Sequence, residues 1–412
     1  MLKNYLKITI AVLKRRKFFT FISLFGISMT LTILVVVTSF LDHLFSAGYP
    51  EINREKSLYS VTIEQIDTKN QGQQSGPMSF SFINKYIKSL KSPAKVSLTS
   101  MVSTANMYRD NKKIRVFFKY TDAEFWEIHQ FDFLEGKPYS KRDIENNEFG
   151  VVINEDLRDK YFGNGVSCIG KTIDLDNQKH KIVGVVKGVP ITRPHTSADI
   201  YLPYNTTKED LKDPNYRGSF AAIVLAKNEN DLPKIKAEFA EVARKIPIVS
   251  QGGFNPDKII VRLDDYVESF VKNLFRRDDN TTILYSSLVL IALVFMSLPA
   301  INLININTSR ILERASEIGI RKAFGASSKV LVGQFVVENI FLTLIGGFIA
   351  IIFSFLIILY INSSQIIPNS DLEINWKVLG IAMIASLIFG LLSGVYPAWR
   401  MSKMHIVDAL KA

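Results

Sequence analysis

The 412-residue sequence has one cysteine and five histidines, and this scarcity excludes several kinds of site. Cys168 has no partner for an intrachain disulfide, and we expect it to be a small, half-buried residue in a turn rather than a reactive thiol. The histidines lack the spacing of zinc ligands, and no serine lies in a GxSxG elbow. The sequence therefore predicts no catalytic residue, no metal and no cofactor in this chain.

One motif match is misleading. Gly165 to Thr172 (GVSCIGKT) satisfies the phosphate-loop pattern GxxxxGK[ST]. A functional phosphate loop follows a buried strand and opens a helix, whose N-terminus receives the phosphates. Here the next residues, Ile173 to Asp176, alternate as in a strand. We interpret the stretch as a turn between two strands.

Long hydrophobic runs are abundant, in contrast. Four of them reach the roughly 20 apolar residues that a helix needs to cross a bilayer; they are Phe18 to Leu41, Ile283 to Ile306, Val330 to Ile361 and Trp376 to Tyr396. The alternative for the first run is a cleaved signal peptide, but its apolar region exceeds the 7–15 residues, approximately, that are usual there. Four transmembrane helices place both termini on one side.

The basic charge lies beside these runs. The segments 1–17, 307–329 and 400–412 contain fourteen Lys and Arg residues and three acids, whereas the loop 362–375 has no Lys or Arg. Positive charge is retained on the cytoplasmic face, so both termini and the 307–329 loop are expected in the cytoplasm. Because the charge flanks membrane spans rather than one soluble surface, the pI near 9.4 does not indicate a nucleic-acid partner.

Residues 42–280 are long enough to bury a core of their own outside the cytoplasm. Strand-like runs, such as Lys113 to Tyr120, Gly150 to Ile153 and Lys181 to Val186, mix with helical patterns at 80–90 and 232–245. The polar stretch Gln65 to Pro77 is expected to be a mobile loop outside any sheet. The predicted fold class is an α-helical membrane protein with four transmembrane helices and a large α+β extracytoplasmic domain inserted between the first and second.

A helix is predicted over 264–278, leading into the second span without a Pro or Gly. Tyr266, Phe270 and Leu274 lie on one of its faces, at i, i+4 and i+8. Such a stalk would be a mechanical lever or only a rigid tether, and periodicity alone leaves both open.

The third run contains Glu338, and an ionisable side chain at membrane depth is a functional candidate. The run is longer than one span needs, so the alternative is that Glu338 lies in the wet interface. Gly346 and Gly347, with Gly390 and Gly394 in the fourth run, allow close helix contacts within the chain or between subunits.

The order of motifs resembles the FtsX/MacB-like permeases of ABC transporters. Within Arg310 to Gly347 the similar residues are Arg314, Glu317 to Lys322, Gly325-Ala326, Gln334, Glu338 and Gly346-Gly347. The ending Gly394 to Arg400 (GVYPAWR) and Val407 to Leu410 agrees. Residues 42–280 are similar to a MacB-type periplasmic core domain at Phe131 to Gly136, Val151 to Asn154, Phe162-Gly163, Ile169 to Lys171 and Ile182 to Val186.

This resemblance implies an FtsX-like permease domain over 281–400 and a helix in its cytoplasmic loop that docks on an ABC ATPase. The docking residues would be Glu317, Ile318, Gly319, Ile320, Arg321, Lys322, Phe324 and Gly325; a plain interfacial amphipathic helix is the alternative. Only about 17 residues precede the first span, so the ATPase, with its ATP and Mg²⁺, is expected in a separate chain. A second permease subunit, identical or different, and membrane lipid are the other implied partners.

The resemblance also implies a location in the bacterial inner membrane, with the large domain in the periplasm. The leading function is export of peptides, antibiotics or similar amphiphiles, with a periplasmic adaptor and an outer-membrane channel as further candidate partners. Lipoprotein release, as in the LolC/LolE branch, and FtsX-like mechanical regulation of cell-wall hydrolases are the alternatives. The length of 42–280 favours the first two, and the sequence does not name the substrate.

Overall fold

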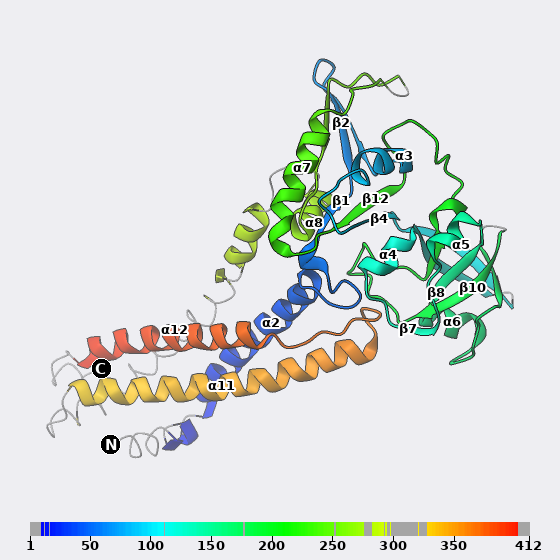
Figure 1. The fold of residues 1–412 in the computed structure, drawn as a ribbon. Helices are drawn as coiled ribbons and strands as arrows, with labels where there is room; N and C mark the ends of the chain where they lie inside the picture. The colour runs from blue at the N-terminus through cyan, green and yellow to red at the C-terminus, as the bar shows by residue number, and fades with distance from the viewer. Residues whose placement is uncertain are drawn as a thin grey trace. The chain divides into compact units, whose positions relative to one another are not determined.

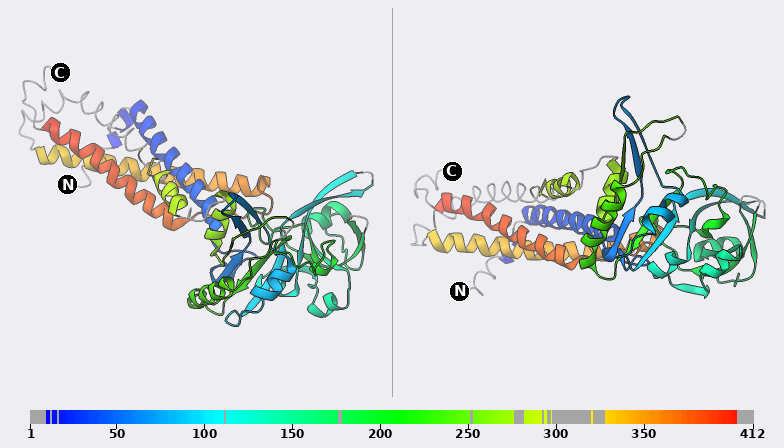
Figure 2. Two further views of the ribbon diagram at one scale, coloured as in Figure 1. Left: turned by 90° about the horizontal axis from the view of Figure 1, so that it is seen from above. Right: turned by 45° about the horizontal axis from the view of Figure 1, so that its top comes forward.

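The computed structural model describes residues 10–11, 13–15, 17–110, 112–175, 178–250, 253–275, 282–291, 293–294, 297, 320 and 328–402. The chain forms two compact units. One, the helical unit, contains Met1–His43, Thr282–Ile366 and Asp371–Ala412. The other, the α+β unit, contains Leu44–Thr281 and Ile367–Ser370. Figures 1 and 2 show the elements of both units along the chain.

The α+β unit is built on a mixed sheet. Its strand order is β1-β12-β4-β6-β11-β8-β10-β7, with β5 on β6 and β9 on β10. The pairs β8–β10 and β6–β11 are parallel and the others antiparallel. The bounds are β1 Ser57–Ser60, β4 Lys95–Ser100, β5 Ser103–Arg109, β6 Lys112–Thr121, β7 Phe133–Gly136, β8 Gly150–Asn154, β9 Thr172–Leu175, β10 Gln178–Val186, β11 Ile200–Pro203 and β12 Phe220–Leu225.

Short helices cover the sheet and close its core. The helices are α3 Phe80–Phe82, α4 Ala123–Ile128, α5 Lys141–Glu145, α6 Glu155–Phe162, α7 Leu232–Arg244 and α8 Tyr266–Phe275, with the single turns η1 Arg54–Lys56, η2 Ile83–Ile87, η3 Tyr204–Thr206 and η4 Glu229–Asp231. Four of them, α3 to α6, begin where a side chain caps the helix; for example, Asp122 accepts from Phe125 N at 3.1 Å and Asn154 accepts from Leu157 N at 2.8 Å. These elements make an α+β fold, as predicted.

The stretch predicted to be a mobile loop is a β-hairpin instead. Strands β2 (Ile63–Asp67) and β3 (Gly72–Gly76) pair with each other, and β13 (Lys258–Val261) completes a three-stranded sheet on the other side of β2. Asp67 organises the turn by accepting from Asn70 N at 3.0 Å. The prediction was wrong because main-chain pairing and this turn, rather than hydrophobic alternation, form the hairpin.

Two other expectations need correction. The stretch Gly165 to Thr172 connects a helix, α6, to a strand, β9, rather than two strands. It opens no helix, unlike a phosphate loop, and runs into a strand, as the alternating residues after it predicted. Cys168 is fully buried within the core behind β8 and β10 rather than half-buried, because its small apolar side chain fills space under that loop.

The helical unit contains α2 (Lys17–Phe45), α11 (Ser328–Ser364) and α12 (Trp376–Ser402), and α11 packs along α12 (Figures 1 and 2). Among the described residues, Lys17–Phe45 and Val332–Ser364 are long and apolar enough to cross a membrane. Thr282–Ile291 and Trp376–Ile388 are shorter apolar helices. The predicted span 283–306 lies mostly outside the described residues, so four spans remain a prediction.

Two adjacent glycines fit α11 against its neighbours. A Cβ on Gly346 would lie 2.7 Å from Cγ2 of Ile27 in α2, and one on Gly347 would lie 2.9 Å from Cε of Met383 in α12. Small residues allow such approach where lipid supplies no hydrophobic drive. At these two positions, the close contact is therefore within the chain.

Candidate functional site

The predicted ATPase-docking residues fall almost entirely outside the described residues. Ile320 alone is described; it is helical and 50% exposed. For Glu317, Ile318, Gly319, Arg321, Lys322, Phe324 and Gly325 the docking role stays a prediction.

Glu338 lies inside α11 and is 1% exposed, so it is buried among protein atoms; its depth in the membrane stays a prediction. Gln334, Asn339 and Thr343 are also buried on this helix, and the Thr343 hydroxyl donates to the Asn339 carbonyl at 2.9 Å. On α2, the Thr32 hydroxyl lies 3.4 Å from the carbonyl of Ala350. This hydroxyl-to-carbonyl contact links α2 to α11, as polar side chains do between membrane helices.

The predicted stalk residues lie on α8. Tyr266 is 4% exposed, and its ring centroid is 5.6 Å from that of Tyr59 in β1. Phe270 meets Phe45, at the end of α2, edge to face at 5.4 Å. Leu274 lies on the same helix, and its side chain is outside the described set. Within the α+β unit, α8 therefore touches the end of the helix that leaves the first predicted span.

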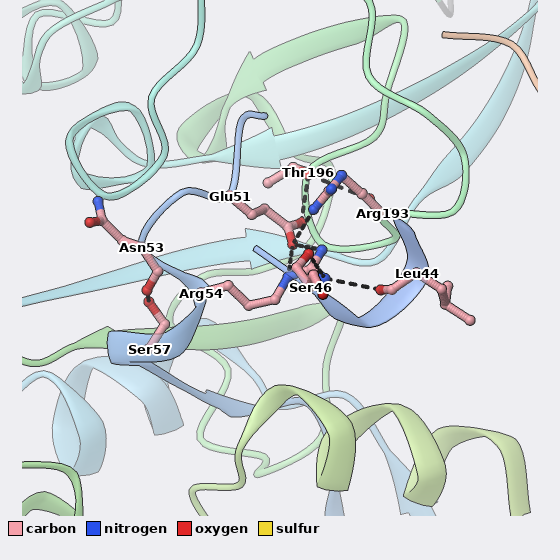
Figure 3. A network of polar contacts seen from close by, with 8 residues as sticks. All are labelled: Leu44, Ser46, Glu51, Asn53, Arg54, Ser57, Arg193 and Thr196. Carbon is pink, nitrogen blue, oxygen red and sulfur yellow. Dashed lines mark hydrogen bonds and ion pairs between the residues drawn. The ribbon is translucent and has the colours of Figure 1, made fainter. Parts of the chain in front are cut away.

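Beside this contact is a buried group of polar and charged residues that we call the Glu51 cluster. All of its members are at most 7% exposed. It consists of Glu51, Arg54, Lys119, His129, Arg193, His195 and Thr196 (Figure 3 shows four of them).

Glu51 is the central acceptor of the cluster. Arg54 donates to its Oε2 from Nε at 2.9 Å and from Nη2 at 2.5 Å, and the Thr196 hydroxyl donates to Oε1 at 2.6 Å (Figure 3). Burial alone would raise the pKa of Glu51, but the charge of Arg54, together with His129, His195 and the Thr196 hydrogen bond, outweighs burial and lowers the pKa to about 2. Glu51 is therefore an anion at any physiological pH.

Arg54 also holds the end of α2. Its Nη1 donates to the carbonyls of Leu44 at 2.9 Å and of Ser46 at 2.8 Å, and its guanidinium lies 3.8 Å from the ring centroid of Tyr266. Helix C-terminal carbonyls carry partial negative charge, so a cation there is stabilising. One guanidinium thus touches the end of α2, the start of α8 and the buried carboxylate.

The remaining basic residues come from strand β6, from the end of α4 and from the connection between β10 and β11. Lys119 in β6 donates to the carbonyls of Pro194 at 2.7 Å and His195 at 3.1 Å; burial lowers its pKa to about 7, against the opposing charge of Glu51. Burial likewise lowers the pKa of His129 to about 4 and that of His195 to about 3. Both imidazoles are neutral at pH 7, which limits the buried positive charge.

This arrangement joins the end of α2, the start of α8 and the β10–β11 connection. In the described part of the chain, no group of three or more His, Cys, Asp or Glu residues is placed to hold a metal ion. The Glu51 carboxylate is occupied by Arg54 and Thr196. We did not anticipate the cluster from the sequence, because Glu51 and Thr196 are 145 residues apart and neither lies in a motif.

Comparison with protein families identifies the class. A model described as the MacB-like periplasmic core domain matches residues 20–242, which is more than half of the chain, and a model described as the FtsX-like permease C-terminal matches 289–406. The protein is therefore an ABC-transporter permease by class. The chain belongs to the MacB-like and FtsX-like permease family, which confirms the resemblance predicted from its motifs.

Similar proteins include the macrolide export ATP-binding/permease protein MacB of Pasteurella multocida, which is 28% identical over 69% of this chain and 41% of its own length. The protein of the same name from Hahella chejuensis is 24% identical over 95% of this chain and 57% of its own length. The chain thus spans about half the length of these relatives.

Solved structures that match this chain include the periplasmic region of MacB from Actinobacillus actinomycetemcomitans, at 14% identity and a TM-score of 0.36, covering 53% of this chain and 93% of that one. Another is the extracellular domain of the noncanonic ABC-type transporter YknZ from Gram-positive bacteria, at 15% identity and a TM-score of 0.34, covering 44% and 91%.

Proposed function

We propose that this chain is the permease subunit of a MacB/FtsX-type ABC transporter that exports peptides, antibiotics or similar amphiphiles from the periplasmic side of a bacterial inner membrane. The observation that supports it most is the pairing of both family models on one chain, a periplasmic core domain followed by a permease domain. ATP and Mg²⁺ act on a partner ABC ATPase. A second permease subunit completes the membrane part.

The proposed docking segment is the helix around Glu317 to Gly325 in the cytoplasmic loop. Arg321 and Lys322 would meet acidic residues of the ATPase, while Ile318, Ile320 and Phe324 would enter an apolar groove on it. Fully desolvated charge pairs and apolar anchors at the centre of an interface supply most of its binding energy.

Movement would then reach the α+β unit through α2 and α8. Two contacts within that unit support this route: Phe45 against Phe270, and Arg54 bonded to Leu44 and stacked on Tyr266. Both helices lead, along the sequence, towards predicted membrane spans. A buried, hydrogen-bonded joint transmits displacement because a close-packed interior does not deform continuously.

The test is affinity purification of the tagged chain in mild detergent, with mass spectrometry of what accompanies it. We expect an ABC ATPase with the wild type and with a matched reversal in the N-terminal tail (Lys3→Glu, Lys7→Glu). It should be lost from the double variant Arg321→Glu, Lys322→Glu. Other partners would separate an exporter, with adaptor and outer-membrane channel, from a lipoprotein-releasing permease or a regulator of cell-wall hydrolases. Absence of an ATPase from every sample, with the protein folded, would refute the proposal.

A further inference from the structure

Arg193 is the cluster member whose position is not explained by the contacts described so far. Its side chain is 5% exposed, and its Nη1 lies 3.9 Å from Oε2 of Glu51. A charge-assisted hydrogen bond is about 1 Å shorter. Nε and Nη1 are both buried without a hydrogen-bond partner. A buried cation thus faces a carboxylate at a separation that forms an ion pair but no hydrogen bond.

The residues around Arg193 hold its side chain in place near Glu51. A Cβ on Gly48 would lie 2.5 Å from its Nη2, so the guanidinium packs directly against the backbone between α2 and Glu51. Its own loop is braced, since the Arg193 carbonyl accepts from Ser197 N at 2.8 Å and the Tyr201 hydroxyl donates to the Thr196 carbonyl at 2.7 Å. Arg193 therefore belongs to the body of the α+β unit.

Arg54, the present partner of Glu51, is attached to different elements. Its other contacts are the carbonyls at the end of α2 and the ring of Tyr266 in α8. A shift of these helix ends against the sheet would displace those acceptors and pull the Arg54 guanidinium away from the Glu51 carboxylate, which the Thr196 hydroxyl holds from the β10–β11 connection. The carboxylate would then be buried without a hydrogen-bonded cation, a costly state unless the nearby Arg193 closes on it.

We propose that Arg54 and Arg193 compete for Glu51, so that the carboxylate exchanges between a helix-end arginine and a sheet-side arginine. The structure has the first pairing, and a movement of about 1 Å completes the second. With this exchange, the point where the end of α2 meets the start of α8 has two alternative positions rather than one fixed position. Its use in ATP-driven movement rests on the proposed function, whereas the exchange itself does not.

A mutant cycle on the purified full chain in detergent tests the exchange. Thermal unfolding is measured for the wild type, Arg54→Gln, Arg193→Gln and the double variant, and again for all four with Glu51→Gln. If Arg193 replaces Arg54, the Arg54→Gln substitution lowers Tm more when Arg193 is absent, with a non-additivity of about 4 °C or more. In the Glu51→Gln background this coupling should fall to near zero.

The Glu51→Gln arm separates exchange from simple repulsion between the two cations, which would give coupling of the same sign but would persist without the carboxylate. Arg158, ion-paired with Glu135 and Asp159 elsewhere in the unit, is the matched control, and Arg158→Gln should add to Arg54→Gln without coupling. Additive Tm shifts for Arg54 and Arg193, or coupling that survives Glu51→Gln, would overturn the proposal. Should Arg54→Gln fail to fold, Arg54→Lys replaces it, and a structure of that variant should show Arg193 within hydrogen-bond distance of Glu51.

Discussion

Substituting Glu51 by Gln removes the one carboxylate of the cluster while keeping its size. Arg54 and Arg193 then stay buried without a counter-charge, and breaking a buried pair in this way costs about 3–5 kcal/mol. The pKa of Glu51 gives an independent figure: a fall from 4.5 to about 2 corresponds to about 3 kcal/mol of stability near neutral pH. For a domain of this size, such a loss lowers Tm by about 6–20 °C.

The matched control is a second Glu–Arg pair with the same i,i+3 spacing. Glu241 and Arg244 are also ion-paired, at 2.6 Å, but their side chains are 62% and 73% exposed. Glu241→Gln should therefore change Tm by no more than about 2 °C. Both variants are measured in the purified full chain by tryptophan fluorescence, where Trp126 in α4 reports on the α+β unit. Equal, small shifts for the two variants would refute the claim that the Glu51 cluster carries stability.

Two further predictions follow from packing and titration. The lowered pKa values of His129 and His195 mean that the unfolded chain binds more protons than the folded chain between about pH 6.5 and pH 4, so stability should fall as pH drops through that window. Tm should therefore be lower at pH 5 than at pH 7.5. A Tm that does not change with pH would contradict the neutral burial of both histidines. Gly346→Ala should lower Tm because its Cβ would lie 2.7 Å from an α2 side chain, an overpacking cost of about 1–3 kcal/mol. Gly380→Ala is the control and should leave Tm unchanged, since a Cβ there has nothing within 4 Å. Equal shifts for the two variants would refute the close contact.

Elements with strong periodicity could be predicted from the sequence. The runs at 113–120, 150–153 and 181–186 became β6, β8 and β10, and the pattern at 232–245 became α7. In each of these elements, apolar residues pack into a buried core, so the local sequence pattern and the tertiary environment agree.

The hairpin β2–β3 shows where such reasoning stops. Its second strand reads Gly-Gln-Gln-Ser-Gly, a composition that favours a loop, and only pairing with β2 places it in a sheet. Strand propensity depends on the neighbours that a strand meets, and β13, the other neighbour of β2, lies nearly 200 residues further along the chain.

The Glu51 cluster was beyond prediction for a related reason. Its members come from the segment after α2, from β6, from the end of α4 and from the β10–β11 connection, and no spacing rule joins them. One weak signal existed: Lys119 is a charged residue within the apolar run of β6, where a buried partner is needed. The sequence could show that Lys119 needed acceptors but could not show which ones.

The most direct test of the central claim, mechanical transmission through α8, measures ATP hydrolysis and export together in a reconstituted complex of this chain with its ATPase. A Gly-Gly insertion after Phe270 interrupts α8, and the same insertion in the turn between β2 and β3 is the control. The account predicts that the α8 insertion abolishes export while ATP hydrolysis continues and the α+β unit still unfolds cooperatively, and that the control retains both activities. Export at the wild-type rate with α8 interrupted would contradict it.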